Sequence, residues 1–235
     1  MLALSYSETY LALTIPFIIF WIGFLIFSKK TRKEQLIMSL LFLPLGPLSE
    51  ILYFKDYWLP KSIFPLSFFS LTIFPEDLIF GFCIAGIGAV VYEVFLGKRL
   101  QAIKTQNHIG LLVILIIAAV VTLPLWLWGM NSIFTTSIGF IVVALLIIAQ
   151  RKDLLMHSLI SGLGVMIIMF ISYILLFKFV VANTDELYKQ GWLIYGTKYG
   201  KTFWNVPLTE MIWGFSWGMM IGPLYEFMKK VGHIK

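Results

Sequence analysis

Acidic residues within apolar stretches are the feature of this sequence with the clearest chemical meaning. Six of the 12 acidic residues lie within predicted apolar spans or at their edges: Glu50, Glu76, Asp77, Glu93, Glu210 and Glu226. Because a charged side chain costs about 2.5–3.5 kcal/mol at the centre of a membrane helix, such residues indicate a functional site. Acids that share a poorly hydrated site keep one of them protonated, so the chemistry they suggest is proton transfer.

Four of these acids are candidate catalytic residues. Glu76, Asp77 and Glu210 fall at the predicted outer ends of two spans, each just after a proline. The alternative is that they only stabilise helix N-termini, where the macrodipole favours carboxylates. Glu50 lies about one turn inside the outer end of another span. We expect either that Glu50 belongs to the same cluster as these three acids or that it is solvated at a kink in its helix.

The other two acids, Glu93 and Glu226, precede lysines near the opposite ends of their spans. Glu226 and Lys230 have the i,i+4 spacing of a helical ion pair, so interfacial pairing with lysine is the simplest prediction. Both acids follow a tyrosine, and this shared context keeps a functional interpretation open.

The acids also belong to an internal repeat. A shift of 133 residues places five residues of 74–98 on identical or similar residues of 205–230: Asp77 on Glu210, Gly81 on Gly214, Phe82 on Phe215, Tyr92 on Tyr225 and Glu93 on Glu226. Residues 54–58 match 188–192 at a shift of 134. Two blocks in the same order indicate a duplication, which predicts a repeated architecture.

The composition is that of an integral membrane protein. The chain is 60% hydrophobic and 13% charged, with a mean hydropathy of +0.91. Soluble domains are nearer 45–50% apolar and about 25% charged. The net charge of +6 resides in short loops beside apolar spans, so it does not indicate nucleic-acid binding. The single cysteine, Cys83, excludes an intramolecular disulfide.

The hydrophobic pattern predicts seven spans of about 20 residues. They cover residues 9–28, 35–54, 76–97, 109–129, 131–150, 154–180 and 207–228. Twelve basic residues follow the first, third, fifth and seventh spans, and six lie on the other side. This bias predicts an outer N-terminus and a cytoplasmic C-terminus. We expect the plasma membrane of a prokaryote, with the first span retained because no basic segment precedes it.

The expected fold is therefore all-α, with seven transmembrane helices in a 3+1+3 parallel tandem repeat. Residues 1–100 and 131–235 form the two three-helix repeats, and residues 101–130 provide the connecting helix. Such repeats are related by a pseudo-twofold axis along the membrane normal. The spacing of Gly214, Gly218 and Gly222 predicts a smooth face for close helix packing.

Cofactor signatures do not occur in the sequence. We find no dinucleotide fingerprint, no Walker loop and no spacing of His, Asp and Glu that suggests a metal. His108 and His157 are predicted at loop edges. The last span has no lysine for a retinal Schiff base.

Two aromatic-rich loops lie on the predicted outer side. They contain Tyr57, Trp58, Phe64, Phe68 and Phe69 in one loop, and Trp192, Tyr195, Tyr199, Phe203 and Trp204 in the other. Taken alone, these loops are typical of interfacial aromatic belts.

Motifs in both halves resemble the heterodimeric-type lycopene cyclases, whose three-helix domains occur singly or in tandem. Each such domain has a loop tryptophan, then Pro-Glu-Glu and Leu-Phe-Phe at the start of its third helix. Here Trp58 and residues 75–80 (PEDLIF) are similar in the first half. Trp192 and residues 207–213 (PLTEMIW) are similar in the second, with Thr209 in place of one acid.

The resemblance implies ring closure at the end of a linear carotenoid, an intramolecular lyase or isomerase reaction without a cofactor or metal. It implies a polyene or isoprenoid substrate taken from the bilayer, with membrane lipids as the other partners. Aromatic faces would stabilise the cation that forms during ring closure. The candidate residues for this contact are Phe80, Trp213, Phe215 and Trp217. The alternative is that these side chains only pack against their neighbours. Other possible functions are a non-enzymatic membrane binding or scaffold protein and a small transporter, although the fourth and fifth spans carry no charge to line a polar path.

Overall fold

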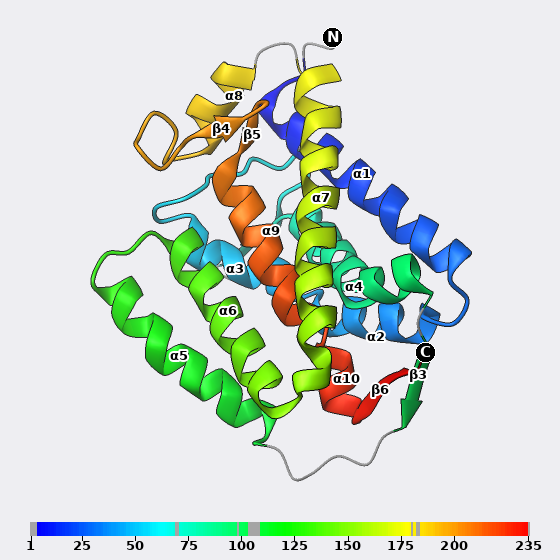
Figure 1. Cartoon of the computed structure of the whole chain (residues 1–235). Helices are drawn as coiled ribbons and strands as arrows, with labels where there is room; N and C mark the ends of the chain where they lie inside the picture. Colours follow the sequence, from blue (N-terminus) through cyan, green and yellow to red (C-terminus); the bar gives the residue numbers. More distant parts are fainter. Residues whose placement is uncertain are drawn as a thin grey trace.

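The computed structural model describes residues 4–68, 71–97, 99–102, 109–179, 181 and 184–234. Phe69, Lys98, Lys104, His108 and Lys235, which enter the sequence predictions, lie outside the described residues. The helices are α1 (Tyr6–Phe27), α2 (Arg32–Phe42), α3 (Leu45–Tyr53), α4 (Pro75–Leu96), α5 (Leu111–Leu127), α6 (Ser132–Gln150), the 3-10 turn η1 (Lys152–Leu154), α7 (Leu155–Phe179), α8 (Thr184–Gly191), α9 (Leu208–Ile221) and α10 (Leu224–Lys229). The prediction of an all-α protein is confirmed (Figure 1).

Short strands form antiparallel pairs, two of them local hairpins and one between distant parts of the chain. β1 (Leu66–Phe68) pairs with β2 (Leu71–Ile73), β3 (Arg99–Ala102) with β6 (Val231–Ile234), and β4 (Thr202–Phe203) with β5 (Val206–Pro207), all antiparallel. The β3–β6 pair connects the segment after α4 to the C-terminal segment.

Within the described residues, four helical segments are long and apolar enough to cross a membrane: α1, α4, α6 and the η1–α7 segment Lys152–Lys178. The α2–α3 pair is bent by 43° and makes a fifth if it counts as one span. α5 is apolar but has 17 residues. These segments support an integral membrane protein. Seven spans and the tandem repeat remain predictions.

Two predicted spans are interrupted at prolines. The span expected over 35–54 divides into α2 and α3 at Leu43 and Pro44, and residues 205–230 do not form one helix. That segment ends as α9 at Ile221 and restarts as α10 after Pro223. Proline lacks the backbone N–H that a continuous helix needs and its ring clashes with the preceding turn, which explains both breaks.

The two acid-bearing helices, α4 and α9, lie in the interior of the bundle. α4 packs against α1, α2 and α7, and α9 packs against α6 and α7, while α5 packs on α6 at one side (Figure 1). A Cβ at Gly218 would lie 2.5 Å from the Ser161 carbonyl oxygen, and one at Gly222 would lie 2.5 Å from the Ser161 side chain. The predicted close packing at the α9 glycines is therefore confirmed.

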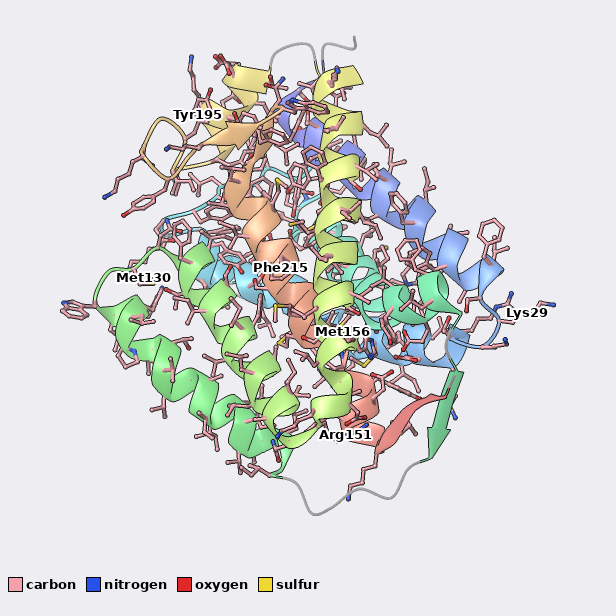
Figure 2. The ribbon with its side chains drawn as sticks, in the orientation of Figure 1. Lys29, Met130, Arg151, Met156, Tyr195 and Phe215 are labelled. Carbon is pink, nitrogen blue, oxygen red and sulfur yellow. The ribbon has the colours of Figure 1, made fainter. Side chains whose placement is uncertain are left out.

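The two ends of the bundle carry different elements. The start of α1, α8 and β4–β5 lie in the upper part of Figure 1, and α10, β6 and the end of α4 lie in the lower part. Figure 2 shows Tyr195 in the upper part and Arg151 in the lower part. Arg151 donates a hydrogen bond to the Val231 carbonyl, which joins η1 to β6.

Candidate functional site

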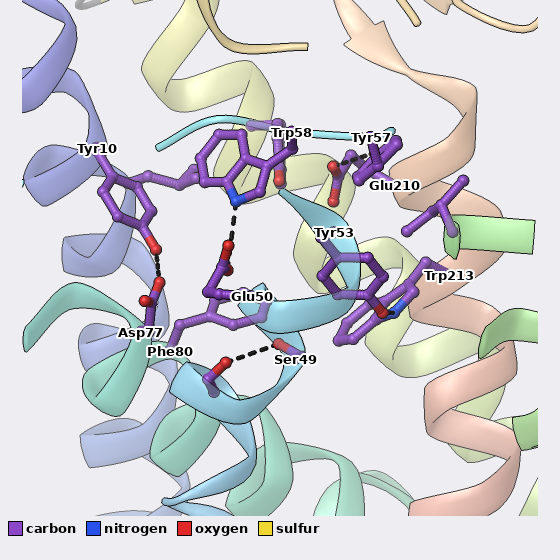
Figure 3. Close-up of a pocket in the computed structure, with 14 residues that line it drawn as sticks. Tyr10, Ser49, Glu50, Tyr53, Tyr57, Trp58, Asp77, Phe80, Glu210 and Trp213 are labelled. Carbon is purple, nitrogen blue, oxygen red and sulfur yellow. Dashed lines mark hydrogen bonds between the residues drawn. The ribbon is translucent and has the colours of Figure 1, made fainter. Parts of the chain in front are cut away.

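Three of the predicted acids converge on one cavity. Glu50 on α3, Asp77 on α4 and Glu210 on α9 all line it, although their helices are far apart in the sequence (Figure 3). The cavity has a volume of about 70 Å³. Each of the three side chains is at least nine-tenths buried, so the carboxyl groups face an apolar, poorly hydrated environment.

Helix starts position two of these acids. Pro75 is the first residue of α4, so Asp77 lies in its first turn, and Glu210 lies in the first turn of α9 after the extended residue Pro207. Both acids thus have the helix N-terminal placement that the sequence predicted. Gly46 of α3 approaches α4 so closely that a Cβ there would lie 2.0 Å from the Asp77 carbonyl oxygen. This contact holds Glu50 and Asp77 on adjacent walls.

Glu210 has the densest hydrogen bonding of the three. The Trp192 indole N–H donates to its carboxyl at 3.0 Å, and the Tyr57 hydroxyl donates to the same oxygen. Tyr173 on α7 also hydrogen-bonds this carboxyl. Several donors aimed at one carboxyl group favour its ionised form, whereas the burial of Glu210 opposes it. Burial, then the charge of Glu210, raises the pKa of the Tyr57 hydroxyl well above its usual range, so this residue remains a donor.

Glu50 has a different environment. The Trp58 indole N–H donates to one of its oxygens at 3.3 Å. Its other oxygen is buried and has no hydrogen-bond partner in the part of the chain that the structure describes. Burial of a carboxyl group with so few donors favours its neutral, protonated form. Glu50 and Glu210 also interact electrostatically, and two nearby carboxyl groups ionise together only at a cost.

Among the described residues, Asp77 accepts one side-chain hydrogen bond, from the Tyr10 hydroxyl of α1 (Figure 3). Tyr10 also packs edge-on against Trp58, with ring centroids 5.0 Å apart. The three acids therefore occupy three distinct environments in one cavity.

The comparison with protein families bears on this site. Residues 131–228 match the family model of lycopene cyclase. Comparison with curated proteins and with solved structures gave no match. The match includes Trp192, Glu210 and Trp213, whereas Glu50 and Asp77 precede the matched residues. The matched residues thus supply one wall of the cavity, and the first part of the chain supplies the others.

The remaining predicted acid is placed beside the cavity. Glu76 is 1% exposed and adjoins Asp77 in the first turn of α4, but it does not line the cavity. One of its carboxylate oxygens is buried without a hydrogen-bond partner among the described residues.

The candidate aromatic residues separate into three positions. Phe80 and Trp213 line the cavity. Trp217 lies one turn further along α9 and stacks on Trp213, with the ring centroids 5.5 Å apart and the planes at 4°. Phe215 is half-buried and faces α7 at Gly162 rather than the cavity.

Sequence reasoning missed the tyrosines of the site and treated the loop tryptophans as an interfacial belt. Tyr57, Trp58 and Trp192 are buried, whereas Phe64 and Trp204 of the same loops are exposed. The two loops are joined by an isolated bridge between Trp58 and Trp192. The repeated loop tryptophan was the available signal, because each indole donates to a cavity acid.

A larger apolar cavity of about 580 Å³ lies beside the acid cavity. It lies between α5, α6, α9 and the α2–α3 pair, and its lining includes Phe42, Phe140 and Trp217. Tyr53 lines the acid cavity and hydrogen-bonds Thr136, which lines the apolar cavity, at 3.0 Å. The Trp213 indole N–H donates to the Tyr53 hydroxyl at 2.8 Å. One layer of side chains therefore separates the two cavities.

The predicted pairing of Glu226 with Lys230 is not what the structure shows. Lys98, the lysine that follows Glu93, lies outside the described residues. Both acids are buried, at 0% and 2% exposure, and each lies 3.7 Å from a ring nitrogen of His157, whereas Lys230 is exposed. His157 is the third residue of α7, near the helix start as predicted, but it is buried, at 1% exposure. The pairing failed because α4, α7 and α10 meet there and exclude water.

Proposed function

We propose that this protein is a carotenoid cyclase that closes the end of a linear polyene into a ring by proton transfer within the membrane. The convergence of Glu50, Asp77 and Glu210 on one buried, aromatic-lined cavity is the observation that carries the proposal. The lycopene cyclase match over residues 131–228 supports the substrate class.

Glu50 is the proposed proton donor. It is buried with a single long hydrogen bond and one unpartnered oxygen among the described residues, so it can hold a proton and direct it into the cavity. Its proton adds to the terminal alkene, the next alkene attacks the resulting cation, and a carbon–carbon bond closes the ring. Loss of a proton from a ring carbon restores neutrality, so the reaction is an isomerisation.

Glu210 is the proposed counter-charge to the cation. Its hydrogen bonds from Tyr57, Trp192 and Tyr173 favour the carboxylate, and a fixed negative charge in a dry site strongly stabilises developing positive charge. Asp77, with one donor, is the proposed acceptor of the proton that leaves the ring. Glu76 lies beside the cavity in the first turn of α4 and has no direct role in the proposed proton transfer.

Aromatic faces supply the second source of cation stabilisation. Phe80 and Trp213 line the cavity, and their ring centroids are 5.9 Å apart. Cation–π contact contributes about 2 kcal/mol or more when the site is desolvated. Trp217 stacks on Trp213 and supports its position. Phe215 contacts α7 at Gly162.

The polyene chain is proposed to lie in the larger apolar cavity. That cavity is lined almost wholly by apolar side chains, whereas the acid cavity contains the polar groups. The end group would reach the acids by displacing the layer formed by Tyr53, Thr136 and Trp213. Substrate taken from the lipid phase would then need no path through water.

The finer architecture belongs to the same proposal. Two three-helix units, 1–100 and 131–235, joined by a connecting helix within 101–130, would explain why Trp58 and Trp192 both donate to acids and bridge each other. A parallel repeat with seven spans and an outer N-terminus would place the acid cavity toward the outer leaflet. The host would be the plasma membrane of a prokaryote.

Expression in lycopene-accumulating bacteria, followed by pigment chromatography, tests the function. The expected result is a new cyclic carotenoid with the mass of the linear precursor. A variant with Glu210→Gln should accumulate the linear pigment at equal membrane-inserted protein. Unchanged pigment with the wild-type protein, tested on lycopene and on longer or hydroxylated linear carotenoids, would reject the cyclase in favour of a binding or scaffold protein.

A further inference from the structure

A second cluster of ionisable residues occupies the other end of the helices that bear the first. Glu93 on α4, Glu226 on α10 and His157 on α7 place one carboxylate oxygen each and a ring nitrogen within 4.8 Å of one another. Asp77 and Glu93 are 16 residues apart on α4, which corresponds to about 24 Å at the helical rise. The two clusters are therefore separate sites.

Glu34 of α2 adds a third carboxylate to this cluster. It is 2% exposed, and among the described residues neither of its carboxylate oxygens has a hydrogen-bond partner. It is near enough to interact electrostatically with both Glu93 and Glu226, although its oxygens lie outside the group of three ligand atoms within 4.8 Å. A buried acid with unsatisfied oxygens near two other acids indicates that a further group belongs with them.

The arrangement has a charge problem that a cation would resolve. Three carboxylates this close repel one another when ionised, and burial makes each charge costly. His157 neutralises at most one of them, since an imidazole carries at most one positive charge. A divalent cation would compensate for the remainder and provide the missing partner for Glu34.

The donor set and its geometry fit a first-row transition metal. Oxygen and imidazole donors together suit Zn²⁺, Mn²⁺, Fe²⁺ and Co²⁺ better than Ca²⁺ or Mg²⁺, which prefer oxygen alone. Ligands about 2.0–2.2 Å from such an ion lie about 3.0–3.5 Å from one another. His157 Nε2 lies 3.7 Å from Glu93 and Nδ1 lies 3.7 Å from Glu226, and the three ligand atoms lie within 4.8 Å of one another. A contraction of about 1–2 Å would bring them around one ion. One ring nitrogen would bind the ion.

The surroundings hold the imidazole and offer an access path. The Tyr92 ring stacks on His157, with centroids 4.5 Å apart and planes at 22°, which restricts the orientation of the imidazole. A cavity of about 430 Å³ reaches Glu93 from the loop that contains Lys29 and Lys30. An ion could enter through this cavity.

We propose that Glu34, Glu93, His157 and Glu226 form a buried site for one divalent transition-metal ion that ties α2, α4, α7 and α10 together. All four side chains are at most 2% exposed, and a closed set of four protein ligands is typical of a structural rather than a catalytic metal. The ligands come from both parts of the chain: Glu93 and Glu226 are partners in the predicted duplication, and Glu34 and His157 are each the third residue of their helix. The metal would join the two parts opposite the acid cavity.

The test uses the full chain, purified in detergent with its affinity tag removed and stripped with a chelator. Titration with Co²⁺, followed by visible absorption, should reach saturation at one ion per chain, and metal analysis of unstripped protein should find about one transition-metal ion. Adding Mn²⁺ or Zn²⁺ to stripped protein should raise the melting temperature by several degrees.

His157→Ala and Glu226→Gln should abolish the Co²⁺ signal, whereas Glu186→Gln, at an exposed acid of α8, should retain it. Folding of each variant is checked by its elution as a monodisperse peak. Wild-type protein that binds no Co²⁺, Mn²⁺ or Zn²⁺ would overturn the proposal and leave the acids protonated or paired with Lys29. Undiminished Co²⁺ binding by the folded variants would also overturn it. Neither result depends on cyclase activity.

Discussion

At the scale of single residues, hydrogen-bond donors distinguish three chemically similar acids. Glu210 receives donors from Tyr57, Trp192 and Tyr173, whereas Glu50 receives one long bond from Trp58. Hydrogen-bond donors stabilise a carboxylate and burial destabilises it. The environment of Glu210 is therefore the more favourable for a negative charge, and that of Glu50 is the more favourable for a bound proton. The residues that assign these roles are aromatic side chains, not the acids themselves.

Amide variants should separate the roles of the acids. We expect Glu50→Gln to lower product formation by about 10²–10⁴-fold, the usual contribution of a general acid. Glu210→Gln should lower it by about 10²–10³-fold, because it removes the charge that stabilises the cation. Glu76→Gln should lower it much less, because Glu76 does not line the cavity. The measurement is cyclic product per unit of membrane-inserted protein, with Glu186→Gln as the exposed control.

Asp77→Asn changes the proposed proton acceptor. We expect its loss of product formation to lie between the losses in Glu76→Gln and Glu50→Gln. Normal activity in both Glu50→Gln and Glu210→Gln would exclude the paired-acid mechanism. A loss in Glu76→Gln equal to that in Glu50→Gln would instead place the proton donor on α4.

At the scale of elements, glycines and prolines set the helix geometry around the site. Pro44 and Pro223 interrupt two helical segments, and the bend at Pro44 brings Glu50 of α3 toward α4. The absence of a side chain at Gly46 and Gly218 lets backbones approach where any Cβ would overlap carbonyl oxygens. Close backbone approach is the usual means of helix association in membranes.

Two glycine-to-alanine changes give a matched test of this packing. A Cβ at Gly218 would lie 2.5 Å from the Ser161 carbonyl oxygen, whereas a Cβ at Gly23 of α1 meets no atom within 4 Å. We expect Gly218→Ala to destabilise the protein by about 1–3 kcal/mol through overpacking. Gly23→Ala should be neutral or stabilise it by up to about 1 kcal/mol, because alanine favours helix.

Thermal unfolding in detergent, monitored by intrinsic fluorescence, measures both changes. Equal melting temperatures for the two variants would show that the α7–α9 contact relaxes without cost. Such a result would contradict the close packing of these helices.

At the scale of the whole molecule, the two buried clusters lie at opposite ends of α4, and the loops at the two ends differ in charge. Lys29, Lys30, Arg32 and Lys33 follow α1, whereas the opposite end has fewer basic residues between its aromatic side chains. Such a bias orients membrane proteins with the more basic side in the cytoplasm. The orientation decides which leaflet adjoins the acid cavity.

Cysteine labelling of intact cells tests the orientation. In a Cys83→Ala background, Lys30→Cys should resist a membrane-impermeant maleimide until the cells are permeabilised, and Lys198→Cys should react directly. Both positions are exposed in the fold, so a lack of reaction reports sidedness rather than burial. Labelling of Lys30→Cys from outside would reverse the proposed topology.

The sequence alone was sufficient for the features that depend on composition and local pattern. Apolar composition predicted a helical membrane protein, and the proline–acid pattern predicted the positions of Asp77 and Glu210 at the starts of α4 and α9. Glycine spacing predicted the close face of α9. These features arise from residues near one another in the chain, where hydrophobic periodicity and helix-end chemistry act directly.

Only the tertiary structure decided which distant residues meet. In the fold, Glu50 lines the same cavity as Asp77 and Glu210, and the loop tryptophans donate hydrogen bonds to two of these acids. Glu93, His157 and Glu226 lie close together although they are widely separated in the sequence. A one-dimensional pattern does not encode the bend between α2 and α3 or the crossing of α4, α7 and α10. These helix positions are set by packing in three dimensions, because burial at the contacts determines which polar groups lose water and must find partners.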